Sequence, residues 1–191
     1  MKFKNMNHKF YLLILFFFIN ILQVFSQVWQ DFEKENIIHV EVRDSTYNIE
    51  NFTFDAVKWE DGPYKFAGGE LKELHIYKDN ELIQVMEGIK ETLEMNPYLI
   101  FTFYDYNLDG HIDFRILRDC GKTCYFDYYL FNPETQKFEL AEDWKWVRID
   151  EINKDKKQFW DFPSGTAVEG SRDLYQIEEG NKLRKIKTIS Y

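Results

Sequence analysis

The chain has 191 residues, of which 24 are Lys or Arg, 33 are Asp or Glu and 45% are hydrophobic. Residues 1–26 hold three of the lysines and none of the acids, so residues 27–191 carry a formal net charge of −12. This charge argues against nucleic-acid binding, because phosphate contacts need a basic face. An aromatic content of 18% argues against intrinsic disorder, because disordered chains are poor in aromatic residues.

Residues 1–26 have the pattern of a secretory signal peptide. Three lysines precede an apolar run of about 15 residues, and Ser26 is a small residue at a suitable cleavage point. The alternative is a membrane anchor, but the run is shorter than the roughly 20 residues that a spanning helix needs. We therefore expect cleavage, a periplasmic or secreted location, and no membrane span in residues 27–191.

Residues 27–191 are expected to form a single all-β domain. Short alternating runs separated by turn residues dominate, and no Gly/Ser/Pro linker divides the chain. The expected architecture is a small antiparallel domain of hairpins, propeller-like or barrel-like, with one calcium loop. Strands are predicted at residues 37–43, 49–54, 71–78, 81–86, 99–104, 111–117, 125–131, 137–140, 158–162, 174–178 and 183–188.

The clearest predicted hairpin is centred on Asp79-Asn80, a dipeptide that favours a two-residue turn between strands. Closing that turn places Ile76 opposite Ile83 on one face. On the outer face, the same register places His75 beside Gln84.

Two segments of the chain also resemble each other. Residues 132–138 and 153–159 each run from an Asn through a polar turn to a Phe. Repeated hairpin units of this kind suit a small propeller or barrel, although polar turns can also be similar by chance.

The sharpest motif is Asp-Tyr-Asn-Leu-Asp-Gly-His-Ile-Asp at residues 105–113. Oxygen-bearing side chains stand at positions one, three, five and nine, with Gly110 at position six. Calcium takes six to eight oxygen ligands, and alternate residues of a tight loop can supply them. The predicted ligands are Asp105, Asn107, Asp109, the main-chain carbonyl of His111, and Asp113.

An EF-hand is not expected here, because position twelve is Ile116 instead of a bidentate Glu. The flanking residues alternate as strands do, which favours a shorter calcium loop within β structure. The alternative is an acidic surface turn with Asp-Gly at its tip. We expect a bound calcium ion to have a structural role that ties two strands together.

Cys120 and Cys124 are the two cysteines of the chain. An exported protein favours a disulfide between them. A zinc site would need two more ligands, and His111 is the nearest histidine in the sequence. A thioredoxin-type pair has two intervening residues, whereas this pair has three.

The sequence contains no Gly-x-Ser-x-Gly, His-Glu-x-x-His or phosphate-loop motif, and the histidines after residue 26 are isolated from one another. We therefore expect no enzymatic activity. Trp144 and Trp146 alternate and would form a sugar platform if both were exposed, but core packing of one of them is more common.

From residue 99 to about residue 188, the order of features is similar to that of a family of small exported bacterial proteins. The shared features are the calcium loop, Tyr-Leu-Phe-Asn-Pro at residues 129–133, Lys-Lys-Gln-Phe at residues 156–159, and a final hairpin. That family has a β-propeller-like fold and one calcium site. A characterised member is an immunity protein that inhibits a lysozyme-like effector of a contact-dependent secretion system.

The resemblance implies a protein partner, namely a basic peptidoglycan-cleaving enzyme whose cleft this chain would occlude. Lysozyme inhibitors often use a Ser-Gly loop with a nearby Tyr, so Ser164 and Gly165, in the loop at residues 163–172, are the candidate partner-binding residues. The sequence departs from that pattern, because no Tyr follows before Tyr175. The alternative function is a calcium-stabilised envelope module that binds a glycan or a protein.

Overall fold

The structure is a computed structural model that describes residues 28–41, 46–57, 70–90, 100–120, 123–161 and 170–191. The predicted signal segment lies outside the described residues. Across the described ranges the chain is all-β, as predicted, with three antiparallel sheets, three short 3-10 helices and no α-helix. None of these sheets closes into a barrel. No helix in these ranges has the length and apolar character needed to cross a membrane.

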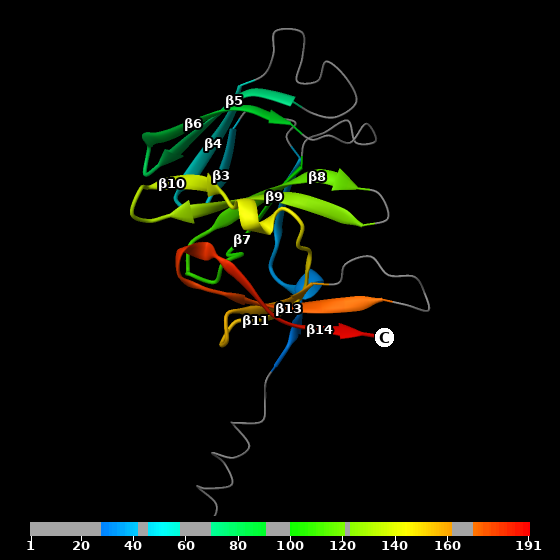
Figure 1. The fold of residues 1–191 in the computed structure, drawn as a ribbon. Helices are drawn as coiled ribbons and strands as arrows, with labels where there is room; N and C mark the ends of the chain where they lie inside the picture. Colours follow the sequence, from blue (N-terminus) through cyan, green and yellow to red (C-terminus); the bar gives the residue numbers. More distant parts are fainter. Residues whose placement is uncertain (1–27, 42–45, 58–69, 91–99, 121–122, 162–169) are drawn as a thin grey trace, which may run out of the picture.

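The three sheets are named here by their place in Figure 1. The upper sheet has the order β3 (Thr46–Ile49), β4 (Phe52–Val57), β5 (Glu70–Lys78) and β6 (Glu81–Lys90). The central sheet has the order β10 (Lys137–Leu140), β9 (Cys124–Asn132), β8 (Asp113–Cys120), β7 (Ile100–Tyr104) and β2 (Ile38–Glu41). The lower sheet has the order β1 (Gln30–Asp31), β11 (Ile149–Asn153), β12 (Gln158–Asp161), β13 (Ser171–Ile177) and β14 (Leu183–Ser190). The 3-10 helices are η1 (Phe32–Lys34), η2 (Glu142–Trp144) and η3 (Glu179–Asn181).

Figure 1 shows the central sheet between the upper and lower sheets. One hydrophobic core lies on each of its faces, so the central sheet is covered on both sides. The core toward the upper sheet consists mainly of Phe and aliphatic side chains, among them Phe54, Phe103 and Phe114. The core toward the lower sheet is richer in Tyr and Trp, including Tyr128 and Trp144. Aromatic side chains with a polar end are stable in a core when that end finds a hydrogen-bond partner.

The alternation on which the predicted strands at residues 111–117 and 125–131 rest is confirmed in β8 and β9. Phe114 and Ile116 lie in the upper core, and Tyr128 and Leu130 lie in the lower core. The prediction of one strand over residues 49–54 is wrong. Ile49 and Phe52 are instead paired across a tight turn, in which Glu50 has a φ of 54° and interrupts the extended backbone.

The β5–β6 hairpin is confirmed, and both residues of its Asp79-Asn80 turn have positive φ. Its predicted register holds only for the two pairs next to the turn, because a β-bulge follows at Ile83. Ile76 lies opposite Gln84, and Ile83 has no direct partner across the ladder. The extra residue moves every later side chain of β6 to the opposite face. His75 therefore lies opposite Val85.

The strands β1, β3 and β11 are absent from the prediction, apart from Ile49 at the end of β3. The other predicted strands occur within a few residues of their predicted limits, and the ends of three of them, at residues 42–43, 99 and 162, lie outside the described residues.

Candidate metal centre and adjoining groove

The predicted calcium loop connects β7 to β8 at the edge of the lower core. Leu108 has a φ of 59° and Gly110 a φ of 93°, so the backbone enters the left-handed region twice within three residues. A Cβ atom on Gly110 would meet no atom within 4 Å. Glycine is therefore favoured at this position by its backbone conformation and not by lack of space.

The backbone of the loop holds two of the predicted ligand side chains. Asp105 accepts hydrogen bonds from the N–H groups of Asp109 (3.0 Å) and Gly110 (2.9 Å), one on each carboxylate oxygen. Asp109 accepts one from the N–H of His111 at 2.9 Å. Hydrogen bonds to ionised carboxylates are stronger than neutral ones, so they fix the oxygen atoms relative to the loop.

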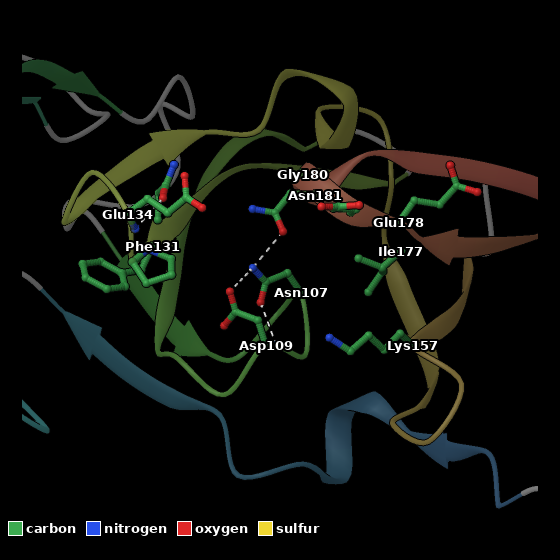
Figure 2. Close-up of a pocket in the computed structure, with 12 residues that line it drawn as sticks. Asn107, Asp109, Phe131, Glu134, Lys157, Ile177, Glu178, Gly180 and Asn181 are labelled. Atoms are coloured by element: carbon green, nitrogen blue, oxygen red, sulfur yellow. Dashed lines mark hydrogen bonds between the residues drawn. The ribbon is translucent and has the colours of Figure 1, made fainter.

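Asn107 ties the loop to the lower sheet, as Figure 2 shows. Its Nδ2 atom donates to Asp109 Oδ2 at 2.8 Å and to Asn181 Oδ1 at 2.9 Å. Asn181 belongs to η3, between β13 and β14, and its carbonyl accepts a 2.7 Å hydrogen bond from Trp144 Nε1. From the sequence, Asn181 lies only between the predicted strands at residues 174–178 and 183–188, because a contact over 74 residues leaves no local signal.

Asp113 connects the loop to β9 through hydrogen bonds to backbone N–H groups, which the motif alone did not indicate. It is fully buried, and one oxygen accepts the N–H groups of Tyr106 (2.9 Å) and Asn107 (3.4 Å). The other oxygen accepts the N–H of Phe131 in β9 at 2.8 Å. A carboxylate oxygen has two lone pairs, so the oxygen that accepts only the Phe131 N–H keeps one lone pair for a metal ion.

The carboxylates of the loop repel one another. Burial raises the pKa of Asp105, and the nearby Asp109 raises it further, against the opposing effect of the backbone hydrogen bonds. Burial also raises the pKa of Asp113 well above its usual range, and Asp109 and Asp105 add to that effect. A cation at this place would relieve both the burial of charge and the repulsion.

The donor set fits a hard cation, since carboxylate, amide and main-chain oxygens are the ligands that calcium takes. Asp105, Asn107, Asp109 and Asp113 would hold the ion together with the main-chain carbonyl of His111. Across the described ranges, no three His, Cys, Asp or Glu side chains are gathered as a ready metal-ligand group. Calcium binding at these residues stays a prediction.

A groove of about 680 Å³ adjoins the loop (Figure 2). Four connections line it: the calcium loop, the β9–β10 turn, the β11–β12 turn and the β13–β14 turn with η3. It therefore lies where the ends of hairpins from the central and lower sheets meet. Its lining residues are Asn107, Asp109, Phe131, Asn132, Pro133, Glu134, Lys157, Ile177, Glu178, Glu179, Gly180 and Asn181.

The two similar segments of the sequence form two of these four turns. Asn132 accepts the N–H of Glu134 at 2.9 Å, and Asn153 accepts the N–H of Lys156 at 3.0 Å. Four residues after each Asn, the backbone has a φ near 50°, at Gln136 (56°) and Lys157 (50°). The resemblance between the segments therefore extends to their conformation, one in the central sheet and one in the lower sheet.

The groove is mainly acidic. Asp109, Glu134, Glu178 and Glu179 line it, against a single Lys157. Glu178 forms an ion pair with Arg184 outside the lining. A partner that enters this groove would meet an excess of carboxylates.

Cys120 and Cys124 lie opposite each other on β8 and β9, at the end of the hairpin away from the calcium loop. Cys124 takes part in a disulfide, and this register fits the predicted bridge to Cys120. The state of the pair in the exported protein stays a prediction.

The remaining predicted residues have different outcomes. Ser164 and Gly165 lie outside the described residues. Trp144 is buried, whereas Trp146 is 65% exposed and contacts the ring of Tyr125. Core packing of one tryptophan of the pair is therefore confirmed.

Comparison of the chain with models of known protein families, with curated proteins and with solved structures gives no significant match.

Proposed function

We propose that residues 27–191 form an exported calcium-binding protein that inhibits a peptidoglycan-cleaving muramidase by occluding its cleft, and that has no hydrolytic activity of its own. The observation that carries the proposal is the acidic groove built directly against the Asp105–Asp113 loop. The resemblance of residues 99–188 to the immunity-protein family agrees with it. A propeller-like relation among the three sheets is part of the same proposal.

Calcium would have a structural role in this protein, because it would hold the Asp105–Asp113 loop in one conformation. The loop already contacts η3 through Asn107 and Asn181, and a metal ion would relieve the repulsion between the carboxylates of Asp105 and Asp109. Ordering of the loop would then order one wall of the groove. Coordination of calcium by Asp105 and Asp109 would therefore affect the affinity of the groove for its partner.

The charge of the protein supports a basic partner. Residues 27–191 carry a net charge of −12, and the groove adds a local excess of carboxylates. Complementary fields raise the association rate more than the final affinity, and salt screens them over about 10 Å at 0.1 M. The association rate should therefore fall as the salt concentration rises.

The test is clearing of a cell-wall suspension by a panel of muramidases, including any toxin encoded beside this gene, with and without equimolar protein. The double variant Glu134→Lys and Glu179→Lys should weaken inhibition, because it reverses two exposed charges of the groove. Glu81→Lys is the matched control, since this exposed glutamate lies at the β5–β6 turn outside the groove. Inhibition that the groove variant leaves intact would place the contact elsewhere, and no inhibition across the panel would refute the function.

A glycan-binding module is the second candidate, favoured by one specific observation. The ring of Trp146 is largely exposed, lies 5.4 Å from that of Tyr125, and is stacked on Arg118 at 4.0 Å. Exposed aromatic rings can stack on sugars. Saturable glycan binding that Trp146→Ala abolishes, together with no muramidase inhibition, would favour this function.

A further inference from the structure

A second cavity, of about 520 Å³, lies between the central and lower sheets, away from the calcium loop. It is lined by Thr123, just before β9, and by Cys124 and Phe126 at the beginning of that strand, whereas the groove lies at the other end of β9, beside Phe131. Its volume falls within the roughly 300–1,000 Å³ of typical small-molecule sites. The complete lining is Phe32, Glu33, Ile37, His39, Arg115, Thr123, Cys124, Phe126, Arg148, Ile149 and Asp150.

Arg115 is the deepest charged group of this cavity. Arg115 is only 9% exposed, and its guanidinium carbon lies 3.8 Å from the centre of the Phe126 ring. Nε donates to Thr102 Oγ1 at 3.1 Å, and Nη1 donates to Tyr128 OH at 3.2 Å. Within the described part of the chain, no carboxylate forms an ion pair with Arg115.

A buried cation without an anion is an unusual arrangement in a folded protein. Removal of a charge from water is costly, and proteins normally compensate with an opposite charge. The rings of Phe126, Phe32, Tyr106 and Tyr128 surround Arg115 and supply part of that compensation. A guanidinium has five N–H donors; the bonds to Thr102 and Tyr128 use two of them, and the Tyr106 side chain is a further hydrogen-bond partner.

The other charges near the cavity limit what it would accept. Arg148 is already paired with Asp150, at 2.8 Å, so these two groups largely neutralise each other. Glu33 is exposed and adds a negative charge to the lining, which disfavours a dianion such as a phosphate monoester. Phe32, Ile37 and Ile149 supply apolar walls.

We propose that this cavity binds a small organic monocarboxylate, whose carboxylate pairs with Arg115 and whose apolar body packs against Phe32, Ile37 and Phe126. A guanidinium fork matches a carboxylate in a bidentate geometry, which makes arginine better than lysine for this contact. The site is separate from the calcium loop and from the groove, and it does not depend on muramidase inhibition.

The test is calorimetric titration of residues 27–191, in the presence of calcium, with benzoate and with the neutral analogue benzamide. Benzoate should bind saturably, and benzamide should bind at least about tenfold more weakly, because it lacks the charge. Arg115→Met should reduce benzoate affinity by a similar factor. Arg118→Met is the matched control, since Arg118 lies on the same strand, does not line the cavity, and should leave the affinity unchanged.

Equal binding of benzoate and benzamide, or benzoate binding that Arg115→Met leaves intact, would overturn the proposal. Tighter binding of phenyl phosphate than of benzoate would overturn the assignment to a monocarboxylate. If Arg115→Met does not fold, amide NMR shifts of the unmodified protein decide the matter. Benzoate should then shift the resonances of Arg115, Cys124 and Phe126, and shifts confined to other residues would refute the site.

Discussion

The side-chain amide of Gln84 pairs with the backbone of Phe138 as a neighbouring strand would. Gln84 Nε2 donates to the Phe138 carbonyl at 2.9 Å, and the Phe138 N–H donates to Gln84 Oε1 at 2.8 Å. Gln84 is on β6 and Phe138 on β10, the edge strands of the upper and central sheets. The bulge at Ile83 makes this contact available, because it rotates Gln84 onto the face of β6 that faces the central sheet.

Replacement of Gln84 by Met should destabilise the protein by about 1–3 kcal/mol, because the buried polar groups of Phe138 would lose their partners. Urea unfolding, followed by tryptophan fluorescence, would measure the loss as a lower midpoint with an unchanged slope. The exposed Glu81→Gln at the same hairpin is the control and should have little effect. A Gln84→Met midpoint equal to that of the control would mean that the pairing contributes nothing.

Calcium should raise the melting temperature of metal-free protein, and a chelator should reverse the rise. A ligand that binds only the folded state adds about 2.7 kcal/mol when its free concentration is a hundred times the dissociation constant. Asp109→Ala should abolish this response, and Glu81→Gln should retain it. The readout is the difference between melting with calcium and melting with chelator, so a general loss of stability in Asp109→Ala does not affect it. Verified metal-free protein that melts identically with and without calcium would refute the metal site.

Asp161 should make stability depend on pH. Burial raises its pKa to about 7, the charges of Asp150 and Asp173 add to the rise, and a hydrogen bond from the Arg148 N–H opposes it. The folded state then binds the proton more tightly than the unfolded state, whose carboxyl titrates near 3.8. The contribution of Asp161 is therefore most favourable below about pH 4 and is lost as the pH rises toward 7.

Asp161→Asn tests this dependence, because the amide oxygen can still accept the Arg148 N–H while carrying no charge. The variant should gain stability relative to the unmodified protein between pH 5 and pH 8, as measured by urea unfolding across that range. Asp155→Asn, on an exposed turn, is the control and should show no such trend. A stability difference for Asp161→Asn that stays constant with pH would contradict the raised pKa.

Cys120 and Cys124 should be oxidised to each other in protein taken directly from the cell envelope. Alkylation followed by intact-mass measurement should find no free thiol until reductant is added. Reduction should lower stability only slightly, because the closed loop is far shorter than the 15 residues for which about 3 kcal/mol is expected. Two alkylated cysteines before reduction would reject the bridge.

The sequence alone was sufficient to predict the features that depend on near neighbours along the chain. The Asp79-Asn80 turn, the alternation of β8 and β9, and the tight loop around Gly110 all arise from local conformational preference and hydrophobic period. Such features are encoded within a few residues, so one sequence suffices to read them.

Only the tertiary structure decided which of these elements meet. The bulge at Ile83 shifts the register of β6 away from the predicted one. The shifted register lets Gln84 bond to Phe138, which is 54 residues away in the sequence, so no local pattern indicates it. The link from Asn107 to Asn181 and the burial of Arg115 among aromatic rings likewise join segments with no shared local pattern. Contacts of this kind form because most buried polar groups find a partner once three sheets are packed together, and burial exists only in the folded chain.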